Sequence, residues 1–281
     1  MKLSDYQKNI YSQNGEDGII EKIISLLPAA DKWCVEFGAW DGTYLSNSFN
    51  LIENHGYSAV LIEPDRGKFL KLHRKNHTKE NIVVLNKLVG FEKNNGLDFI
   101  LADTVIPKNF DFLSIDVDGN DFHIWKNISE YHPKIVCIEY NPTIPTEIEF
   151  IQPADLSISQ GSSLSSLVTL SKEKNYELIA VTSCNAIFVT AELFHLFNVI
   201  NNSPQILRED TSLISYIFTG YDGTIFVGGN NKIHWHQISL QERINQLPRI
   251  FRKYPAHYGK IKEFLFKKIY CRKKIKYEGL S

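Results

Sequence analysis

The chain has 281 residues, of which 43 % are apolar, a length and composition that suit one large domain or one domain with an extension. It contains no apolar run of 18 residues and no apolar signal-peptide core at its start, so we expect neither a transmembrane helix nor a secretory leader. Its four cysteines are far apart and lack zinc-ligand spacing, which favours reduced thiols and a cytoplasmic location.

The net charge of −1 conceals an uneven distribution of charged residues. Residues 241–281 contain twelve Lys or Arg and three Asp or Glu, a net charge of +9, and the rest of the chain carries −10. Such a basic tail suits contact with an anionic membrane surface, a phosphorylated substrate or an acidic partner. We therefore keep peripheral membrane contact through the tail as an option and expect no nucleic-acid partner. The sequence leaves the oligomeric state open.

In chain order, short apolar runs alternate with helix-like patterns. Acids at Glu16 and Asp17 open the first helix, whose run IIEKIISLL has helical spacing and ends at Pro28. Further helices are predicted over SNSFNLIENH, which Gly56 closes, over RGKFLKLHRKN, and over 162–174. The apolar runs between them predict five strands: Lys32–Phe37, Tyr57–Glu63, Asn81–Val89, Phe110–Asp116 and Lys134–Tyr140.

Two more runs, Tyr176–Thr182 and Ala186–Val189, are joined by three residues and predict a hairpin. Strands that alternate with helices form a mainly parallel sheet with right-handed crossovers, and the hairpin adds an antiparallel edge. Beyond residue 190 the sequence predicts a helix over AELFHLFNVI, a hairpin that turns around Gly228–Asn231, and basic helix from 240 onward. We therefore predict a domain over 1–200 and an extension over 201–281.

Acidic residues end four of the predicted parallel strands. They are Glu36, Glu63, Asp116 with Asp118, and Glu139. Because ligands of such sheets bind outside the carboxyl ends of the strands, these acids mark the expected site.

The first of these ends reads VEFGAWDG, with Glu36, Gly38 and Gly42 spaced as ExGxxxG. Glycines there let the backbone approach a ligand closely, although an ordinary strand–turn–helix corner also keeps a glycine. Glu63 ends the next strand, where an acid typically binds the ribose hydroxyls of an adenosine. The loop lacks the glycines that a pyrophosphate needs, which favours S-adenosylmethionine over NAD.

Residues 33–65, together with YSQNGED, FLSIDVDGND, VCIEYNP and NAIFV, resemble the FkbM-type methyltransferases over roughly residues 10–190. The resemblance implies a class I (Rossmann-like) methyltransferase fold, a seven-stranded sheet with a C-terminal hairpin, and S-adenosylmethionine as cofactor. It also implies that Glu36, Gly38 and Gly42 line the methionine part and that Glu63 holds the ribose. Asp41 and Asp116 are counted with them as cofactor-binding residues. Members are commonly linked to O-methylation of sugars or polyketide-type natural products.

The stretch SIDVDGNDFHIW allows several interpretations. An EF-hand is excluded, because Asp121 and Asn127 stand where the loop needs glycine and glutamate. The pair Asp116 and Asp118 also fits the DxD of metal-dependent glycosyltransferases. A plain helix start, with Asp118 or Asn120 as N-cap, remains open.

The end of the neighbouring strand adds oxygen ligands to this stretch. Glu139 and Asn141 should lie near Asp118, and together they suit magnesium. The arrangement is similar to that of metal-dependent O-methyltransferases such as the catechol and macrocin enzymes. In those a base follows the first ligand by three residues, where this chain has Asp121, and His123 is a second candidate.

The sequence therefore predicts an S-adenosylmethionine-dependent O-methyltransferase that acts on a hydroxyl of a sugar or glycan precursor with the help of a divalent cation. Two alternatives remain: a metal-dependent glycosyltransferase that uses the DxD pair, and a non-catalytic protein that binds S-adenosylmethionine.

Overall fold

The computed structural model describes residues 1–28, 30–240 and 244–271, which form two compact units, Met1–Thr211 and Ser212–Ser281. We call them the N-terminal and the C-terminal unit. The expected boundary after residue 200 falls inside the first unit, because the chain up to Thr211 stays packed on it: buried Arg208 donates to the carbonyl oxygens of Pro142 and Ile144. None of the helices in the described ranges has the length and apolar character that a membrane span requires.

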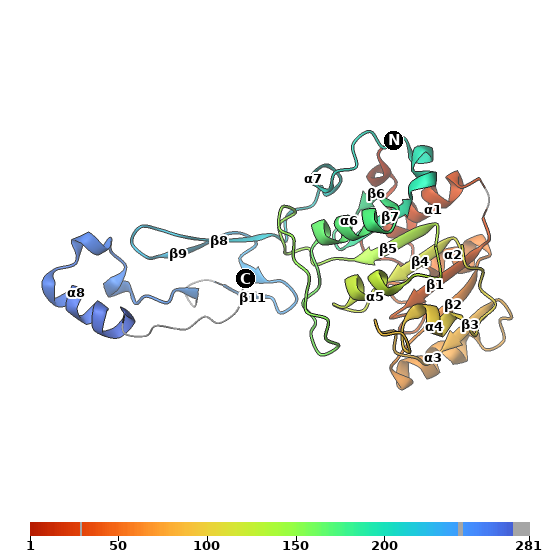
Figure 1. Ribbon diagram of the computed structural model, residues 1–281, viewed down its shortest axis with the longest axis horizontal. Helices are drawn as coiled ribbons and strands as arrows, with labels where there is room; N and C mark the ends of the chain where they lie inside the picture. Colours follow the sequence, from red (N-terminus) through yellow and green to blue (C-terminus); the bar gives the residue numbers. More distant parts are fainter. Residues whose placement is uncertain (29, 241–243, 272–281) are drawn as a thin grey trace. The chain divides into compact units, whose positions relative to one another are not determined.

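The N-terminal unit is built on one seven-stranded sheet with the order β3-β2-β1-β4-β5-β7-β6 (Figure 1). Strands β1 to β5 pair in parallel, and β7 lies antiparallel between β5 and β6. This sheet confirms the predicted Rossmann-like fold with a C-terminal hairpin. The strands are β1 (Trp33–Phe37), β2 (Ser58–Ile62), β3 (Ile82–Leu85), β4 (Phe112–Ile115), β5 (Ile135–Glu139), β6 (Tyr176–Val181) and β7 (Asn185–Thr190).

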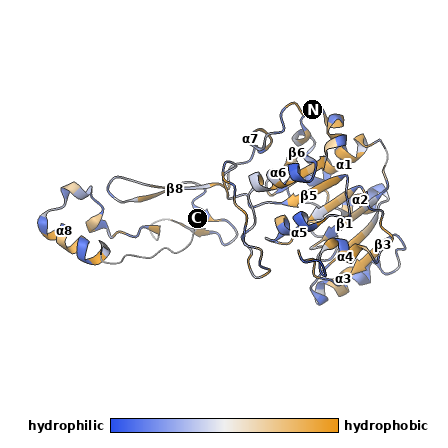
Figure 2. Ribbon diagram, viewed as in Figure 1, coloured by the Kyte–Doolittle hydropathy of each residue, from blue (hydrophilic) through white to orange (hydrophobic). Residues whose placement is uncertain are grey.

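Helices cover both faces of this sheet. The α-helices of the unit are α1 (Glu16–Leu26), α2 (Phe49–His55), α3 (Arg66–Asn76), α4 (Leu97–Leu101), α5 (Asp121–Asn127), α6 (Leu164–Glu173) and α7 (Pro204–Leu207). Side chains of α1, α2 and α3 pack on the face that carries Cys34 and Phe112, and those of α4, α5 and α6 pack on the face of Val35 and Leu113. Because both faces are covered, the central strands are mostly apolar, as Figure 2 shows, and β1 reads WCVEF and β4 FLSI.

Some elements differ from the predictions. The third strand ends at Leu85 rather than Val89, because the Asn86 side chain donates to the carbonyl oxygens of Glu63 and Pro64 and so turns the chain away. The helix predicted over AELFHLFNVI is a 3-10 helix that ends at Phe197, and a further 3-10 turn covers Leu3–Tyr6.

The C-terminal unit contains two small hairpins and a short helix. Its elements are β8 (Ser215–Thr219), β9 (Ile225–Gly229), β10 (Lys232–Ile233), β11 (Ile238–Ser239), 3-10 turns over Arg249–Phe251 and Pro255–His257, α8 (Lys260–Phe266) and a π-helical turn over Lys267–Cys271.

Two predictions for this unit were wrong. The first hairpin turns at Gly220–Thr224, where the Asp222 side chain accepts from the Thr224 N–H at 2.9 Å, whereas Gly228–Gly229 belong to β9. Pro248 and Pro255, which lack a backbone donor, interrupt the basic segment, so helix begins only at Lys260. Residues 241–243 and 272–281 of that predicted helix lie outside the described residues.

Candidate active site

The order of the sheet reverses between β1 and β4, which are neighbours although β2 and β3 separate them in the chain. After β1 the chain continues into α2 on one face, and after β4 it continues into α5 on the other. The two connections therefore diverge at the carboxyl ends of these strands, where ligands of open α/β sheets bind. All the acids that the sequence singled out lie at this edge.

Glu36, near the end of β1, is buried and fully engaged. Its side chain is 5 % exposed and accepts from the Ser48 hydroxyl at 2.7 Å, the Asn47 N–H at 2.9 Å and the Ser46 hydroxyl. Burial raises the pKa of Glu36, and these three donors act in the opposite direction. The carboxylate thus organises the turn that leads into α2.

The two glycines of the motif hold the following loop in a shape that only glycine adopts readily. Gly38 has a φ of +75°, and a Cβ there would lie 2.1 Å from the carbonyl oxygen of Asp116. Gly42 has a φ of +77°, and its Cβ would lie 2.5 Å from the Leu72 Cδ1. Gly38 therefore allows the loops after β1 and β4 to touch at the point where the sheet order reverses.

Glu63 joins the loop after β1 to the end of β2. Its carboxylate accepts from the Trp40 N–H and the Asp65 N–H, each at 2.8 Å, and the residue is 3 % exposed. Each oxygen keeps a second acceptor site for a ligand hydroxyl.

Asp41 caps its own loop. It accepts from the N–H groups of Thr43 and Tyr44 and pairs with Lys75 at 2.7 Å. Desolvation opposes ionisation, yet the Lys75 ammonium and the backbone donors hold the pKa of Asp41 well below its usual range. The structure thus occupies the Asp41 carboxylate with protein donors.

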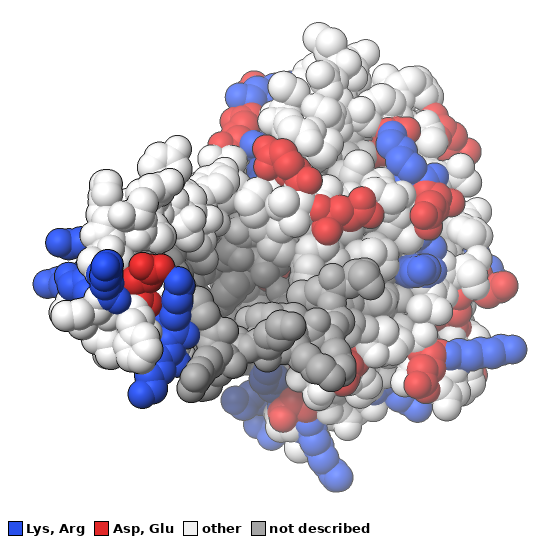
Figure 3. All heavy atoms as spheres, turned by 60° about the vertical axis from the view of Figure 1, so that its left-hand side comes forward, with Lys and Arg blue, Asp and Glu red and all other residues white. Residues whose placement is uncertain are grey.

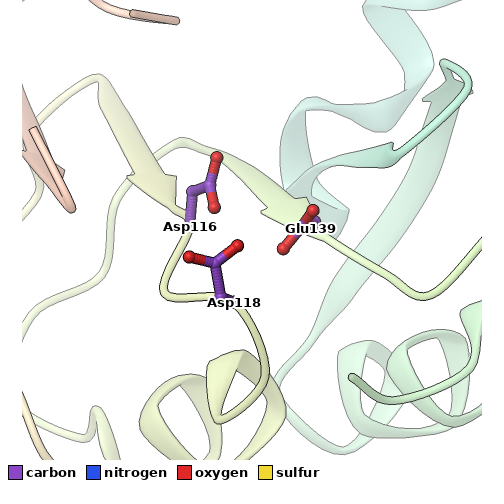
Figure 4. A group of neighbouring side chains, drawn as sticks. All are labelled: Asp116, Asp118 and Glu139. Atoms are coloured by element: carbon purple, nitrogen blue, oxygen red, sulfur yellow. The ribbon is translucent and has the colours of Figure 1, made fainter. Parts of the chain in front are cut away.

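At the ends of β4 and β5 the carboxylates are arranged differently. Asp116, Asp118 and Glu139, which we call the acidic group, offer oxygens that all lie within 4.8 Å of one another. Figure 4 shows the three side chains converging from the end of β4, the following turn and the end of β5. No hydrogen bond or ion pair joins these carboxylates to a protein donor in the part of the chain that the structure describes.

The charges of the acidic group are uncompensated. Desolvation, together with the neighbouring carboxylates, raises the pKa of Asp116 to about 7 although the side chain keeps contact with solvent. The same causes raise the pKa of Glu139 well above its usual value. Oxygen atoms in this number and proximity, without a cationic partner, are the donor set that Mg²⁺ or another hard cation prefers.

The turn that carries Asp118 is held by Asp121. Asp118 has a φ of +56°, in the left-handed region, which Asp tolerates better than most residues. The Asp121 carboxylate accepts from the Val117 N–H at 3.0 Å and the Gly119 N–H at 2.9 Å. Desolvation raises the pKa of the buried Asp121 to about 6, while these backbone donors act against the shift. The stretch is therefore both a helix start and an open acidic turn.

His123 and Asn141 face the segment 142–163 that follows β5. The His123 Nε2 lies 2.7 Å from the Gln152 carbonyl oxygen, so Nε2 carries the hydrogen and Nδ1 remains an acceptor. The Asn141 amide donates to the Gln160 carbonyl, and its oxygen accepts from the Thr143 N–H and hydroxyl. The structure thus places these two predicted site residues against the loop, with the Asn141 oxygen already engaged.

Two buried acids near the amino terminus were missed as organisers. One Asp17 oxygen accepts from the N–H groups of Ile10, Tyr11 and Ser12 at 2.6–2.8 Å, and so closes the loop before α1. Glu16 accepts from Thr182 and Asn185 of the β6–β7 hairpin. The sequence showed only two acids in a first helical turn, a signal that does not distinguish a cap from a tertiary clamp.

No protein-family model matches the chain, and no curated protein matches it in sequence. In structure it is similar to the N-terminal domain of EvdMO1 with SAH bound, at 13 % identity over 64 % of this chain and 82 % of that one, with a TM-score of 0.42. It is also similar to a SAM-dependent methyltransferase from Aquifex aeolicus, at 9 % identity over 60 % and 87 %, with a TM-score of 0.36. The CMeT domain of the citrinin polyketide synthase matches at 12 % identity over 62 % and 51 %, with a TM-score of 0.42. These values are low, and the strand order itself defines the fold.

Proposed function

We propose that the protein is an S-adenosylmethionine-dependent O-methyltransferase. The observation that carries the proposal is the meeting of two loops at the reversal point of the sheet: the glycine loop after β1 and the acidic turn after β4 touch at Gly38 and Asp116. The first loop joins the Glu63 carboxylate through the Trp40 N–H, and the second presents carboxylates that no described donor reaches. A cationic methyl donor and a hydroxylated acceptor are the two substrates that such a pair of loops suits.

The residues present fit the cofactor. Gly38 and Gly42 let the loop after β1 pack tightly against the Asp116 carbonyl and Leu72 with positive φ, and Glu63 retains acceptor capacity for the two ribose hydroxyls. S-adenosylmethionine supplies the methyl group, and its positive sulfonium is favoured near the carboxylates of the acidic group. Glu36 acts by holding the turn over 46–48, because its oxygens already accept three donors.

The acidic group is proposed to hold a divalent cation and the acceptor. Asp116, Asp118 and Glu139 supply the oxygens, and a bound cation lowers the pKa of a hydroxyl that contacts it. Vicinal hydroxyls of a sugar or glycan precursor match such a site. Of the two candidate bases, Asp121 has both oxygens engaged by backbone N–H groups, whereas the His123 Nδ1 has no partner among the described residues. His123 is therefore the better candidate for accepting the proton.

Calorimetry tests the cofactor assignment. S-adenosylmethionine and S-adenosylhomocysteine should bind the full chain in the presence of EDTA, because none of the residues proposed to hold them acts through a bound cation. Binding of a UDP- or GDP-sugar that requires Mg²⁺, without binding of S-adenosylhomocysteine, would refute the proposal. That outcome would favour a glycosyltransferase, the second candidate, which the placement of both Asp116 and Asp118 in the acidic group supports.

A second titration tests the cation. Mg²⁺ or Mn²⁺ should bind the wild type, and Asp118→Asn should abolish that binding while S-adenosylhomocysteine still binds. Asp103→Asn, a change of an exposed acid that precedes β4 and so lies toward the opposite edge of the sheet, is the matched control and should leave both affinities unchanged. Equal methyl transfer with and without chelator removes the cation from the mechanism. Cofactor binding with no transfer to any hydroxylated acceptor would point to a non-catalytic binding protein.

A further inference from the structure

The C-terminal unit exposes a set of apolar side chains on one short helical segment. Ile261, Phe264, Leu265 and Ile269 are 78, 65, 41 and 51 % exposed, and they follow one another at i, i+3, i+4 and i+8. This spacing places them on one side of α8 and the π-helical turn after it. We call these four residues the exposed face.

The exposed face is not the side by which the helix packs on its own unit. Phe266 lies 6.1 Å from Phe251 and 5.4 Å from Tyr258, measured between ring centroids, and Tyr270 lies 6.0 Å from Phe251. These aromatic contacts hold the segment from the other side. The exposed face therefore remains apolar surface after the unit has formed its own core.

Positive charge surrounds the exposed face. The segment 260–271 contains four lysines, at 260, 262, 267 and 268, and one acid, Glu263, which pairs with Lys267. Figure 3 shows Lys and Arg side chains gathered on the visible face of this unit, with little red among them. An apolar face bordered by lysines is typical of helices that lie in the interface of a bilayer, because lysine stems reach past apolar atoms to the head groups.

We propose that this segment binds the surface of an anionic lipid bilayer through the exposed face and its lysines. Anionic head groups match the charge of the segment, and acyl chains match four aliphatic or aromatic side chains that need no specific pocket. A second copy of the chain is a poorer match, because two such faces would bring their lysines together. The proposal concerns a surface outside the candidate active site and does not depend on the methyltransferase assignment.

Co-sedimentation of the full chain with vesicles tests the proposal. The chain should pellet with phosphatidylcholine–phosphatidylglycerol vesicles, release at high salt, and stay in solution with phosphatidylcholine alone. Ile261→Ser with Phe264→Ser should lower the partition coefficient at least about tenfold, because each side chain loses buried apolar area. The matched control, Val105→Ser with Ile200→Ser, changes two apolar residues of the N-terminal unit that are at least as exposed, and it should leave binding unchanged.

Lysine variants measure the electrostatic contribution to vesicle binding. Lys260→Gln, Lys262→Gln and Lys268→Gln should each weaken binding to anionic vesicles about fivefold. Exposed lysines of the N-terminal unit, changed as Lys87→Gln and Lys126→Gln, should have no effect. Absence of binding to anionic vesicles, equal binding to neutral ones, or equal loss in the control variants overturns the proposal. So does a dimer in light scattering that Phe264→Ser dissociates, since the face would then join two copies.

Discussion

Carboxylates end both pairs of neighbouring strands, yet the two pairs are built in opposite ways. Glu36, near the end of β1, and Glu63, which follows β2, are almost fully buried, and protein donors reach both oxygens of each. The acidic group, at the ends of β4 and β5, receives no donor among the described residues, and its two aspartates are exposed. The first pair holds loops in place, with acceptor sites of Glu63 left for a ligand, and the second group carries negative charge that a bound cation can neutralise. Substitutions at the two places should therefore fail in different assays.

The largest effect is expected at the acidic group and only in activity. Asp118→Asn should lower kcat/KM for methyl transfer about 1,000-fold, equivalent to about 4 kcal/mol, because it removes a carboxylate from the proposed cation site. The free energy of unfolding should stay the same or rise, since one of three neighbouring like charges is lost. Release of S-adenosylhomocysteine and urea unfolding measure the two quantities. A variant that unfolds easily, with activity proportional to its folded fraction, contradicts the comparison.

The next effect is expected where the two loops touch. Gly38→Ala should lower the free energy of unfolding by about 3 kcal/mol, because the new Cβ would overlap the Asp116 carbonyl and the backbone has a positive φ. Gly56→Ala is the matched control: its φ is +68°, but no atom lies within 4 Å of the new Cβ. It should lose only about 1 kcal/mol, the strain of the left-handed backbone. If thermal unfolding shows equal losses of stability in the two variants, the contact between Gly38 and the Asp116 carbonyl contributes nothing to stability.

Glu36→Gln reverses the pattern of Asp118→Asn. The amide NH₂ cannot accept from the hydroxyls and N–H that surround Glu36, so unfolding should become easier by about 2 kcal/mol. Activity should fall only as far as the loop before α2 loses its shape. Glu53→Gln, a change of an exposed residue of α2, should alter stability by no more than about 0.5 kcal/mol. Stability of Glu36→Gln equal to wild type would place Glu36 with the ligand-binding carboxylates instead.

The smallest effect concerns pH. The folded chain raises the pKa of Asp116 to about 7 from 3.8, so folded Asp116 holds its proton more tightly than the unfolded chain does. Its contribution to stability is therefore most favourable below the unfolded value and declines as the pH rises through the folded one. Between about pH 4 and pH 7, the free energy of unfolding of the wild type should fall by at most about 1 kcal/mol relative to that of Asp116→Asn, because solvent screens an exposed group. Saturating Mg²⁺ should flatten the difference; a profile unaffected by Mg²⁺ argues against a bound cation.

The sequence predicted the sheet well because buried strands are short apolar runs with few rivals. Trp33–Phe37 and Ile135–Glu139 lie within the predicted ranges, and the order of elements confirmed the mainly parallel sheet with its hairpin. The sequence pattern predicted the wrong turn where several segments rich in turn-forming residues lie close together. Asp222-Gly223 formed the turn of the first C-terminal hairpin, although the glycine–asparagine run at 228–231 had the stronger composition.

The sequence indicated the edge of the sheet at which the acids lie. It did not indicate which carboxylates hold loops in place and which are left open to a ligand. An acid at a strand end is visible in the sequence, whereas its donors depend on how distant loops fold back. Glu36 is saturated because the turn before α2 returns over it, and Asp41 is engaged because Lys75 reaches it from α3. Asp116 was assigned to the cofactor, and the structure brings it together with Asp118 and Glu139. Only three-dimensional contacts separate these cases.

The contact between Gly38 and the Asp116 carbonyl also has a consequence for how such a chain can diverge. Because the contact leaves no room for a side chain between the two loops, we expect substitutions in one loop to require changes in the other. Among related sequences, a larger residue at position 38 should occur only together with a shortened or displaced turn after β4. A chimera that exchanges one loop alone should misfold, and one that exchanges both should recover.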